Sequence, residues 1–411
     1  MPFLFSAPFL YLLGISVLAV VLGIQIIVLP WLVVDALSLG SVWVGWVQAM
    51  VLVPNLLFLL VGGALADKAK VLPWLVPLLF VNVLIHAVLS ALVYQGILSI
   101  IILLVYAALL GMSNAFIQPW REYLLKQVKE DNRSELLQKL VAKSSLCLYI
   151  GQAVGIAIAS LMDTVGADIL LLVQAMMVAL GAISFMQLRR LLLAEPQDVK
   201  AESETSQALL FSGIWLGIQD IWRLPDLRTL IAVVAFNGFF HIGVFIVALP
   251  LMVQQVYGEN ILFYSGLQFA FVMGTIITTL VVVYRGGLDS AGRRIIFGLL
   301  YGGVILLALS ARPTLVGLFT LVFFWGVVVG VSSNMGRSVV QSLAPEASRG
   351  RIISLYQLAL FGCAPLGALF AGYAIELWGV LTLLKISGIA SLVVFMATMT
   401  TRALWDVEVN S

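Results

Sequence analysis

Charged residues are scarce in this sequence, and their scarcity excludes a soluble globular protein. Only 10% of the 411 residues are Asp, Glu, Lys or Arg, whereas 62% are hydrophobic and the mean hydropathy is +1.11. A soluble domain carries about 25% charged residues, because it needs them to cover its surface. The apolar residues here occur in runs of about twenty, the length that crosses a bilayer as an α-helix. The composition therefore predicts a polytopic membrane protein.

Cysteine and histidine are also rare, with two residues of each type. Cys147 and Cys363 both lie inside apolar runs, so we expect small packing residues and no disulfide framework. The separated histidines offer no spacing typical of a metal site, and the sequence contains neither a GxSxG nor a GxxxxGK motif. We therefore expect no metal, no cofactor, no intramembrane enzyme and no ATP-driven pump. The net charge of +2 gives no indication of nucleic-acid binding.

Twelve apolar segments predict the spans of an all-α membrane protein. The first run has no basic residue before it and no clear cleavage site, so we expect it to be retained as a span. The expected spans are residues 7–35, 42–65, 72–95, 97–120, 139–162, 167–188, 229–256, 261–284, 295–311, 315–340, 352–376 and 380–402.

The basic residues support this count and predict an orientation. With twelve spans, 20 of the 22 Lys and Arg residues fall on one side of the membrane, and only Arg312 and Lys385 fall on the other. Loops rich in Lys and Arg stay in the cytoplasm, so we expect both termini to be cytoplasmic. We expect the protein to reside in the cell membrane, and in the inner membrane of a bacterium.

The only long polar segment lies between the sixth and seventh spans. Its residues AEPQDVKAESETSQ contain few apolar side chains and predict a flexible linker. Apolar residues then recur at helical spacing, at Leu210, Ile214, Trp215, Ile218, Ile221 and Trp222. This pattern predicts an amphipathic helix, either on the cytoplasmic membrane surface or packed on the loops.

An internal repeat predicts two related halves. GIQIIVLPWLV (Gly23–Val33) resembles GVFIVALPLMV (Gly243–Val253) at an offset of 220 residues, and Arg121 aligns with Arg337 at an offset of 216. The expected fold is two six-helix bundles related by a pseudo-twofold axis, with substrate near the midplane between them and alternating access by rocking. The first bundle, the linker and the second bundle then comprise residues 1–188, 189–228 and 229–411.

The segment GGALADKAK, with Gly63, Asp67 and Lys68, lies between the second and third expected spans. It resembles the signature of the major facilitator superfamily, although Ala69, Lys70 and Val71 stand where Gly and further basic residues are usual. The resemblance to this family extends over nearly the whole length of the chain. RGGLDSAGRR resembles the second-half copy of this signature, with Asp289 and Arg293. LAPEASRGRIISLYQLALFGCAPLGALFAGYAIELWG, VLPWLVVDALS and WLGIQDIWRLPDLR are similar to the enterobactin exporter and macrolide efflux branch.

The resemblance implies a cytoplasmic latch that holds while the outer side is open. The carboxylate of Asp67 is expected to accept hydrogen bonds from a helix N-terminus or to pair with a basic residue, Arg349 or Arg351. The alternative is a solvated turn that follows the positive-inside rule. The expected gating residues are Gly63, Asp67, Lys68, Arg121, Asp289, Arg293, Arg337, Arg349 and Arg351.

In this family's arrangement the first, fourth, seventh and tenth spans line the cavity. Polar residues on these spans and their neighbours are candidates for substrate contact, and the alternative for each is an ordinary hydrogen bond between helices. The candidates are Gln25, Asn55, Asn114, Tyr149, Gln152, Asn237, Gln268, Asn334 and Gln357.

Two residues are candidates for proton coupling. His241 lies near the middle of the seventh span, and the unperturbed pKa of histidine, about 6.5, suits proton exchange. Asp35 lies at the outer end of the first span, where an interfacial role is the alternative, and His86 is expected to be a packing residue. No carboxylate lies at mid-depth of a cavity span, which disfavours a strongly cationic substrate.

These observations predict a secondary active transporter that exports a small neutral or anionic amphipathic compound, siderophore-like or macrolide-like, in exchange for protons. Uptake or lipid flipping on the same fold is the alternative within transport, and a non-transporting membrane receptor is the alternative outside it. The expected partners are the substrate, protons and the lipid bilayer, with a monomeric protein.

Overall fold

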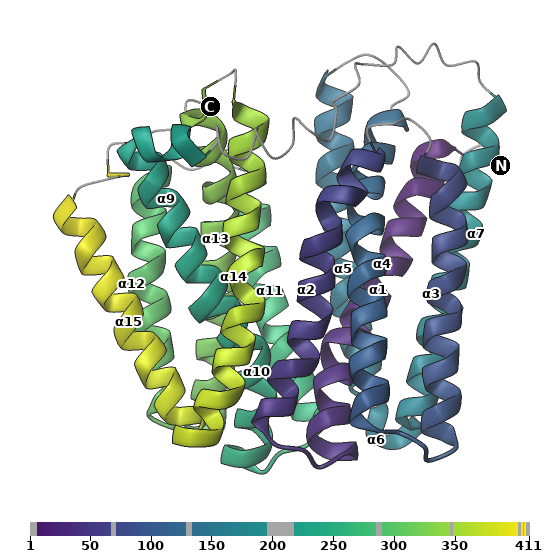
Figure 1. Cartoon of the computed structure of the whole chain (residues 1–411), viewed down its shortest axis with the longest axis horizontal. Coiled ribbons are helices and arrows are strands. Elements are labelled where there is room, and N and C mark those ends of the chain that lie inside the picture. Colours follow the sequence, from purple (N-terminus) through teal and green to yellow (C-terminus); the bar gives the residue numbers. More distant parts are fainter. Residues whose placement is uncertain are drawn as a thin grey trace. The chain divides into compact units, whose positions relative to one another are not determined.

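The computed structural model describes residues 6–66, 71–128, 134–194, 218–284, 290–345, 348–401, 404–405 and 407. All regular elements in these ranges are helices (Figure 1). They form two compact units. Unit 1 comprises Met1–Leu39, Met50–Glu202 and Asn260–Phe269, and unit 2 comprises Gly40–Ala49, Ser203–Glu259 and Ala270–Ser411.

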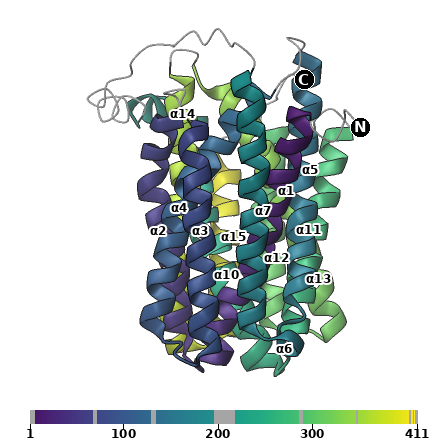
Figure 2. The ribbon, with the colours of Figure 1, turned by 90° about the vertical axis from the view of Figure 1, so that its right-hand side faces the viewer.

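Unit 1 is a bundle of long apolar helices. Helix α1 packs on α5 and α7, and α3 packs on α4 and α7. The close pairing of α3 with α7 is visible in Figures 1 and 2, and α6 connects α5 to α7 at one end of the unit. The elements are α1 (Ala7–Trp31), η2 (Leu32–Ala36), α2 (Ser41–Ala66), α3 (Val71–Tyr94), α4 (Ile100–Gln127), α5 (Ser134–Ala159), α6 (Met162–Val165) and α7 (Ala167–Ala194).

Unit 2 repeats this organisation with the second half of the chain. Helix α12 packs on α13 and α15, and α14 packs on η3, α9 and α10. The elements are α9 (Pro225–Phe236), η3 (Asn237–Gly243), α10 (Val244–Leu251), η4 (Met252–Tyr257), α11 (Ile261–Tyr284), α12 (Ala291–Ser310), α13 (Leu315–Leu343), α14 (Arg349–Trp378) and α15 (Val380–Thr401).

Two helices are divided between the units. Helix α2 begins in unit 2, where Gly40–Ala49 belongs, and continues in unit 1 from Met50. Helix α11 does the reverse, because Asn260–Phe269 belongs to unit 1 and the remainder to unit 2. The boundaries predicted at residues 188 and 229 stay a prediction, because each compact unit includes a short segment from the other half of the chain.

The hydrocarbon core of a membrane offers no hydrogen-bond partners, so backbone N–H and C=O groups have to pair within the chain, and helices achieve this within one segment. Two of the helix N-termini are capped by a side-chain hydroxyl. The hydroxyl of Ser99 accepts a hydrogen bond from the Ile102 amide at 3.4 Å, and that of Thr314 accepts one from the Gly317 amide at 3.3 Å. Each caps an N-terminus whose first amides would otherwise lack partners.

Within the described residues, eleven helices are long and apolar enough to cross a membrane, and α5 contains a shorter apolar stretch, Lys143–Ala159. The protein is therefore a multi-pass membrane protein. Each predicted span coincides with one of these helical segments, but some ends differ. The fourth span was expected to end at residue 120, whereas α4 continues through Pro119 to Gln127. The fifth was expected to end at 162, whereas α5 stops at Ala159 and a separate helical turn follows.

Three π-helical segments were not predicted. Pro30 lies two residues before η2, and its repeat counterpart Pro250 lies two residues before η4. Proline has no amide hydrogen to donate, and a wider turn beside it is one way in which a membrane helix adjusts its hydrogen bonds. The third segment, η3, contains His241.

The internal repeat corresponds to repeated helix contacts. A side chain at Gly23 would collide with the Gln152 carbonyl of α5, and one at Gly243 would lie 2.6 Å from Gly367 of α14. Gly23 and Gly243 are the first residues of the two repeated segments. Small residues at these positions let the helix backbones approach closely, which is how membrane helices associate.

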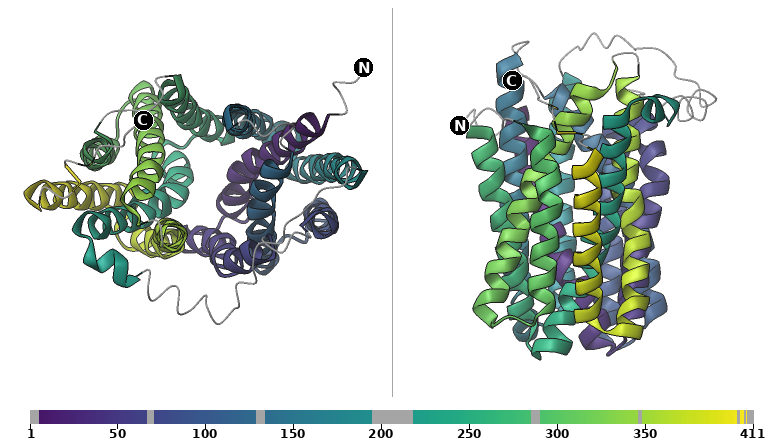
Figure 3. Two further views of the ribbon diagram at one scale, coloured as in Figure 1. Left: turned by 90° about the horizontal axis from the view of Figure 1, so that it is seen from above. Right: turned by 90° about the vertical axis from the view of Figure 1, so that its left-hand side faces the viewer.

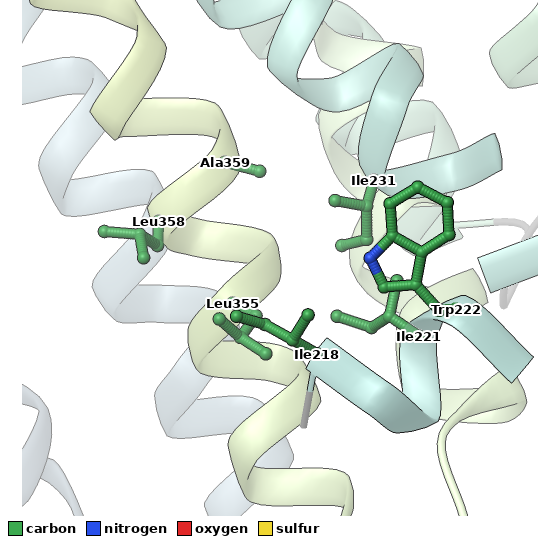
Figure 4. A pocket seen from close by; sticks show the side chains of 7 residues that line it. All are labelled: Ile218, Ile221, Trp222, Ile231, Leu355, Leu358 and Ala359. Carbon is green, nitrogen blue, oxygen red and sulfur yellow. The ribbon is translucent and has the colours of Figure 1, made fainter. Parts of the chain in front are cut away.

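The described end of the linker packs on protein. Leu210, Ile214 and Trp215 lie outside the described residues, but residues 218–223 form a short helix (teal in Figure 3) at one end of unit 2. Its Ile221 is 7% exposed and belongs to a core cluster with residues of α9 and α14. Figure 4 shows the apolar pocket there, which is lined by Ile218, Ile221, Trp222, Ile231, Leu355, Leu358 and Ala359.

Candidate functional site

The buried interior of the described residues carries no fixed charge. All polar side chains buried there belong to Ser, Thr, Asn, Gln or His, and none to Asp, Glu, Lys or Arg. They include Asn82, His86, Gln174, His241 and Gln268. An uncharged interior is what a low-dielectric medium favours, because an unpaired buried charge is strongly destabilising.

A buried polar group in unit 1, which we call the Gln25 cluster, consists of Gln25, His86, Tyr106 and Gln174. The Tyr106 hydroxyl donates to Oε1 of Gln25 at 2.9 Å, and Nε2 of Gln174 donates to the same oxygen at 3.2 Å. The Gln174 amide also donates to the Val21 carbonyl at 3.3 Å. These contacts fix the orientation of the Gln25 amide, with its oxygen facing two donors.

His86 adds an imidazole to this cluster. Its Nδ1 lies 2.8 Å from the carbonyl oxygen of Asn82, so Nδ1 is the donor and Nε2 the acceptor. The imidazole lies edge-on to the Tyr106 ring, with 5.7 Å between centroids. Three buried polar atoms of the cluster have no partner, namely Nε2 of Gln25, Nε2 of His86 and Oε1 of Gln174. The cluster therefore keeps one donor and two acceptors unsatisfied.

A second polar group in unit 1 involves the beginning of α11. Nε2 of Gln268 donates to the Tyr264 hydroxyl at 3.2 Å, and that hydroxyl donates to the Ile26 carbonyl at 3.3 Å. Trp31 stacks on Tyr264 with 5.8 Å between ring centroids. The structure thus places the predicted residue Gln268 in a chain of hydrogen bonds that ends on α1, one residue after Gln25.

His241 is buried inside unit 2, between η3, α12 and α15. Its Nε2 lies 3.3 Å from the Ser391 hydroxyl, which itself donates to the Leu299 carbonyl at 2.8 Å. Because Ser391 has only one hydrogen to donate, Nε2 must be the donor towards it. A side chain at Gly302 would lie 2.6 Å from the imidazole, so α12 covers this face of the ring. His241 therefore serves as a hydrogen-bonded packing residue in this conformation, and its role in coupling stays a prediction.

The other cavity candidates do not gather into one group among the described residues. Asn334 donates to the Gly330 carbonyl at 2.8 Å and to the Thr279 hydroxyl at 3.4 Å. The Oδ1 atom of Asn55 is buried without a partner, and the side chain of Gln357 is exposed. The half-buried candidates are Asn114, Tyr149, Gln152 and Asn237.

Two carboxylates of unit 1 interact near the end of η2. Asp35 is exposed, as is Asp163 in the short helix α6. Partial burial and the negative charge of Asp35 raise the pKa of Asp163 above its ordinary value. Asp35 therefore stands in a like-charge pair at the end of its helix.

Three of the nine expected gating residues, Asp67, Lys68 and Asp289, lie outside the described residues. Gly63 lies in the last turn of α2, and Arg293 donates to the Trp405 carbonyl at 3.0 Å while its guanidinium lies 5.1 Å from the Trp405 ring. The backbone carbonyl of Arg121 accepts from Tyr11, whereas Arg337, Arg349 and Arg351 have exposed side chains. The latch stays a prediction.

A set of contacts inside unit 2, at the beginning of α2, was not predicted from the sequence. The buried Ser41 hydroxyl lies 2.8 Å from the Gly372 carbonyl and 3.1 Å from Oε2 of Glu376, and Nε1 of Trp46 donates to the Tyr373 hydroxyl at 3.2 Å. Tyr106 and Gln174 were not predicted as partners of Gln25 either. A polar residue within an apolar run was the available signal for each, but the run alone does not identify the partner.

Comparisons with known proteins agree on the fold. A model of the Major Facilitator Superfamily matches residues 5–368. A nucleoside transporter, NupG, has 15% identity and a TM-score of 0.67, with 98% of each chain covered. A POT family transporter in complex with 5-aminolevulinic acid has 12% identity and a TM-score of 0.74, with 95% of this chain and 94% of that chain covered. An auto-inhibited POT family peptide transporter has 13% identity and a TM-score of 0.73, with 98% of each chain covered.

No curated protein matches the chain in sequence. The identities to the solved structures are low enough that these structures bear on the fold alone. The family model, in contrast, covers most of the sequence. The chain therefore belongs to the Major Facilitator Superfamily and is a multi-pass membrane transporter.

Proposed function

We propose that the protein is a secondary active transporter that exports a small amphipathic compound, neutral or anionic, in exchange for protons. The observation that carries the proposal is the absence of a buried Asp, Glu, Lys or Arg among the described residues. A cationic substrate moving through a low-dielectric interior needs a compensating anion, and the described interior supplies only amides, hydroxyls and imidazoles. These groups suit a substrate that is recognised by hydrogen bonds.

The same chemistry supports the proposed substrate class. Several buried amides retain unsatisfied atoms, as in the Gln25 cluster, and a neutral polar group can complete their hydrogen bonding. Anionic compounds remain within the proposal because Arg121 and Arg337 are expected at the cytoplasmic ends of their helices. The similarity of the LAPEASRGR segment to the enterobactin exporter and macrolide efflux branch suggests siderophore-like or macrolide-like compounds.

We place proton coupling first on Asp35 and second on His241. The Asp35 side chain is exposed to solvent and its negative charge is felt by Asp163. The raised pKa belongs to Asp163, through partial desolvation and the charge of Asp35, so the two carboxylates together form a candidate proton-carrying pair. The His241 ring is buried and already donates to Ser391, so its proton exchange requires a rearrangement of unit 2.

The test uses everted membrane vesicles energised to be acidic inside. Three labelled compounds of similar apolar size are compared, namely a neutral amide, a catecholate anion and a quaternary ammonium cation. We expect accumulation of the neutral or the anionic compound, and its collapse when the pH gradient is dissipated. Accumulation of the cation alone would contradict the proposed substrate class. Accumulation only in vesicles of the opposite orientation would indicate uptake.

A further inference from the structure

We propose that unit 1 contains a binding site for a neutral amphipathic molecule, entered from the lipid phase between α3 and α4. The apolar part of the ligand lies in a groove between these helices, and its polar end reaches the Gln25 cluster beneath. Tyr106 belongs to both parts. The inference deepens the proposed function by giving the substrate a location, and it rests on that function only in identifying the ligand with the substrate.

The groove lies on the surface shared by the second half of α3 and the first half of α4. Its volume is about 390 Å³, within the range of about 300–1,000 Å³ that small-molecule sites occupy. Its rim is open, since Leu84 is 63% and Ile101 is 69% exposed, while Leu89 at its base is 1% exposed. The lining residues are Val81, Leu84, Ile85, Val88, Leu89, Leu92, Ile101, Ile102, Val105, Tyr106 and Leu109.

The groove lies at a depth where only lipid can fill it from outside. Tyr106 is seven residues beyond Ser99, the cap of α4, which places it about 10 Å along the helix. The hydrocarbon core of a bilayer is about 30 Å thick, so this position is well inside it. An apolar ligand segment therefore reaches the groove through the membrane.

Tyr106 connects the groove to the Gln25 cluster. Its side chain lines the groove, yet only 4% of the residue is exposed, and its hydroxyl donates to Gln25 at 2.9 Å. The His86 imidazole lies edge-on to the Tyr106 ring, with 5.7 Å between the centroids. One phenol thus separates an apolar surface from a buried polar group, and its rotation would open the way between them.

The cluster specifies the polar end of the ligand. Nε2 of Gln25 is an unsatisfied donor, whereas Nε2 of His86 and Oε1 of Gln174 are unsatisfied acceptors. A primary amide, which has two N–H donors and one carbonyl acceptor, matches this set. No Asp, Glu, Lys or Arg lines the groove or the cluster, so a charged end would lack a counter-ion. The complementary ligand is therefore neutral, with an alkyl part and an amide-like or hydroxyl end.

The experiment uses the full-length protein in lipid nanodiscs and a defined probe, a ten-carbon primary amide with a diazirine on its alkyl chain. Photolabelled peptides are located by mass spectrometry. We expect labelling concentrated on α3 and α4, and competition by unlabelled decanamide at least ten times stronger than by decane or decyltrimethylammonium. Equal labelling of the lipid-facing sides of other helices would overturn the site. Equal competition by decane would indicate a lipid chain in the groove and water in the cluster, which also overturns it.

Matched tryptophan variants separate the groove from general lipid exposure. Val105→Trp fills the groove from a position that is 55% exposed, and Met176→Trp adds the same side chain to α7 at a position that is 58% exposed. Both changes point into lipid, so neither strains the core. We expect Val105→Trp to lower amide-competed labelling at least tenfold and Met176→Trp to leave it unchanged. Equal labelling of the two variants would refute the groove.

The polar end is tested with Gln174→Met, which keeps the length of the side chain and removes its amide, that is, both the unsatisfied acceptor and the donor to Gln25 and Val21. We expect the affinity for decanamide to fall about tenfold, whereas labelling by a diazirine-bearing decane stays the same. Equal loss of decanamide affinity and of labelling by the decane probe would indicate a folding defect in Gln174→Met. The comparison of Val105→Trp with Met176→Trp would then decide whether the site exists. Labelling requires neither a pH gradient nor transport, so a negative vesicle experiment with positive labelling would reject the proposed function and keep this site. Transport in vesicles without labelling of α3 and α4 would reject this site and keep the proposed function.

Discussion

A close backbone contact between two helices of unit 2 provides a quantitative prediction. Gly243 closes η3, and a methyl group added there would lie 2.6 Å from both Cα and the carbonyl carbon of Gly367. Carbon atoms pack at about 3.5–4.0 Å, so Gly243→Ala forces the two backbones apart by about 1 Å. A rotamer change cannot relieve this contact, because both neighbours are main-chain atoms.

The expected effect is a balance of two contributions. Overpacking of this kind costs about 1–3 kcal/mol, and alanine regains about 1 kcal/mol over glycine as a helix former. We therefore expect Gly243→Ala to destabilise the protein by up to about 2 kcal/mol. In Gly181→Ala the added methyl lies 3.3 Å from Cδ2 of Leu18, the movable end of a side chain. That control should be neutral or stabilised by up to about 1 kcal/mol.

The assay is unfolding in mixed micelles of increasing SDS content, followed by loss of helical circular dichroism for both variants and the wild-type protein. The helix-forming gain is the same for the two substitutions, so the difference between their unfolding free energies isolates the backbone collision. Equal unfolding free energies of Gly243→Ala and Gly181→Ala would refute the predicted backbone collision. Equal destabilisation of both variants would refute it too, because the Leu18 side chain can move away from the added methyl group.

Three further predictions follow from the described sites and from the latch. Asp35→Asn should abolish transport driven by a pH gradient and retain downhill substrate exchange. His241→Gln keeps an N–H donor for the Ser391 hydroxyl and should retain both kinds of transport. Loss of gradient-driven uptake into vesicles in His241→Gln but not in Asp35→Asn would assign coupling to His241. Asp67→Asn should abolish or strongly slow transport with normal membrane insertion, and cross-linking between cysteines on the two cytoplasmic loops should weaken; wild-type transport with unaltered cross-linking would reject the latch. Ser41→Ala removes a buried donor, so it should lower the free energy of unfolding by about 1 kcal/mol and speed hydrogen exchange at the beginning of α2. Glu376→Gln keeps an acceptor for Ser41 and should leave that exchange rate unchanged. Unchanged exchange in Ser41→Ala would contradict this prediction.

Much of the fold could be predicted because it depends on local patterns. Runs of about twenty apolar residues identify spans without any tertiary information. The repeat that begins at Gly23 and Gly243 is recognisable from the sequence alone, and it marks two equivalent close approaches between helices. The helix ends were less predictable, since Pro119 lies inside α4 without ending it. A proline inside a membrane helix is tolerated when neighbouring groups satisfy the freed backbone.

The candidate sites were harder to predict, because their chemistry depends on partners distant in sequence. Gln25 was recognised as a polar residue on the first helix, but its partners Tyr106 and Gln174 lie 81 and 149 residues away. Helical periodicity gives little help in a helix that is apolar on all sides, since no face is marked as interior. His241 illustrates the same limit, because a histidine near mid-span suits both proton exchange and packing until Ser391 is seen beside it.

The division of α2 between the two units has a consequence for the order in which the protein is made. Ser41 and its partner Gly372 are separated by 331 residues, and a ribosome adds about 5–20 residues per second. The first turns of α2 therefore leave the ribosome roughly 15–65 s before the segment of α14 on which they pack. During that interval the Ser41 hydroxyl has to bond to its own helix, to water or to lipid headgroups. Unit 2 cannot be completed by its own consecutive helices, so its final packing is an event of the finished chain.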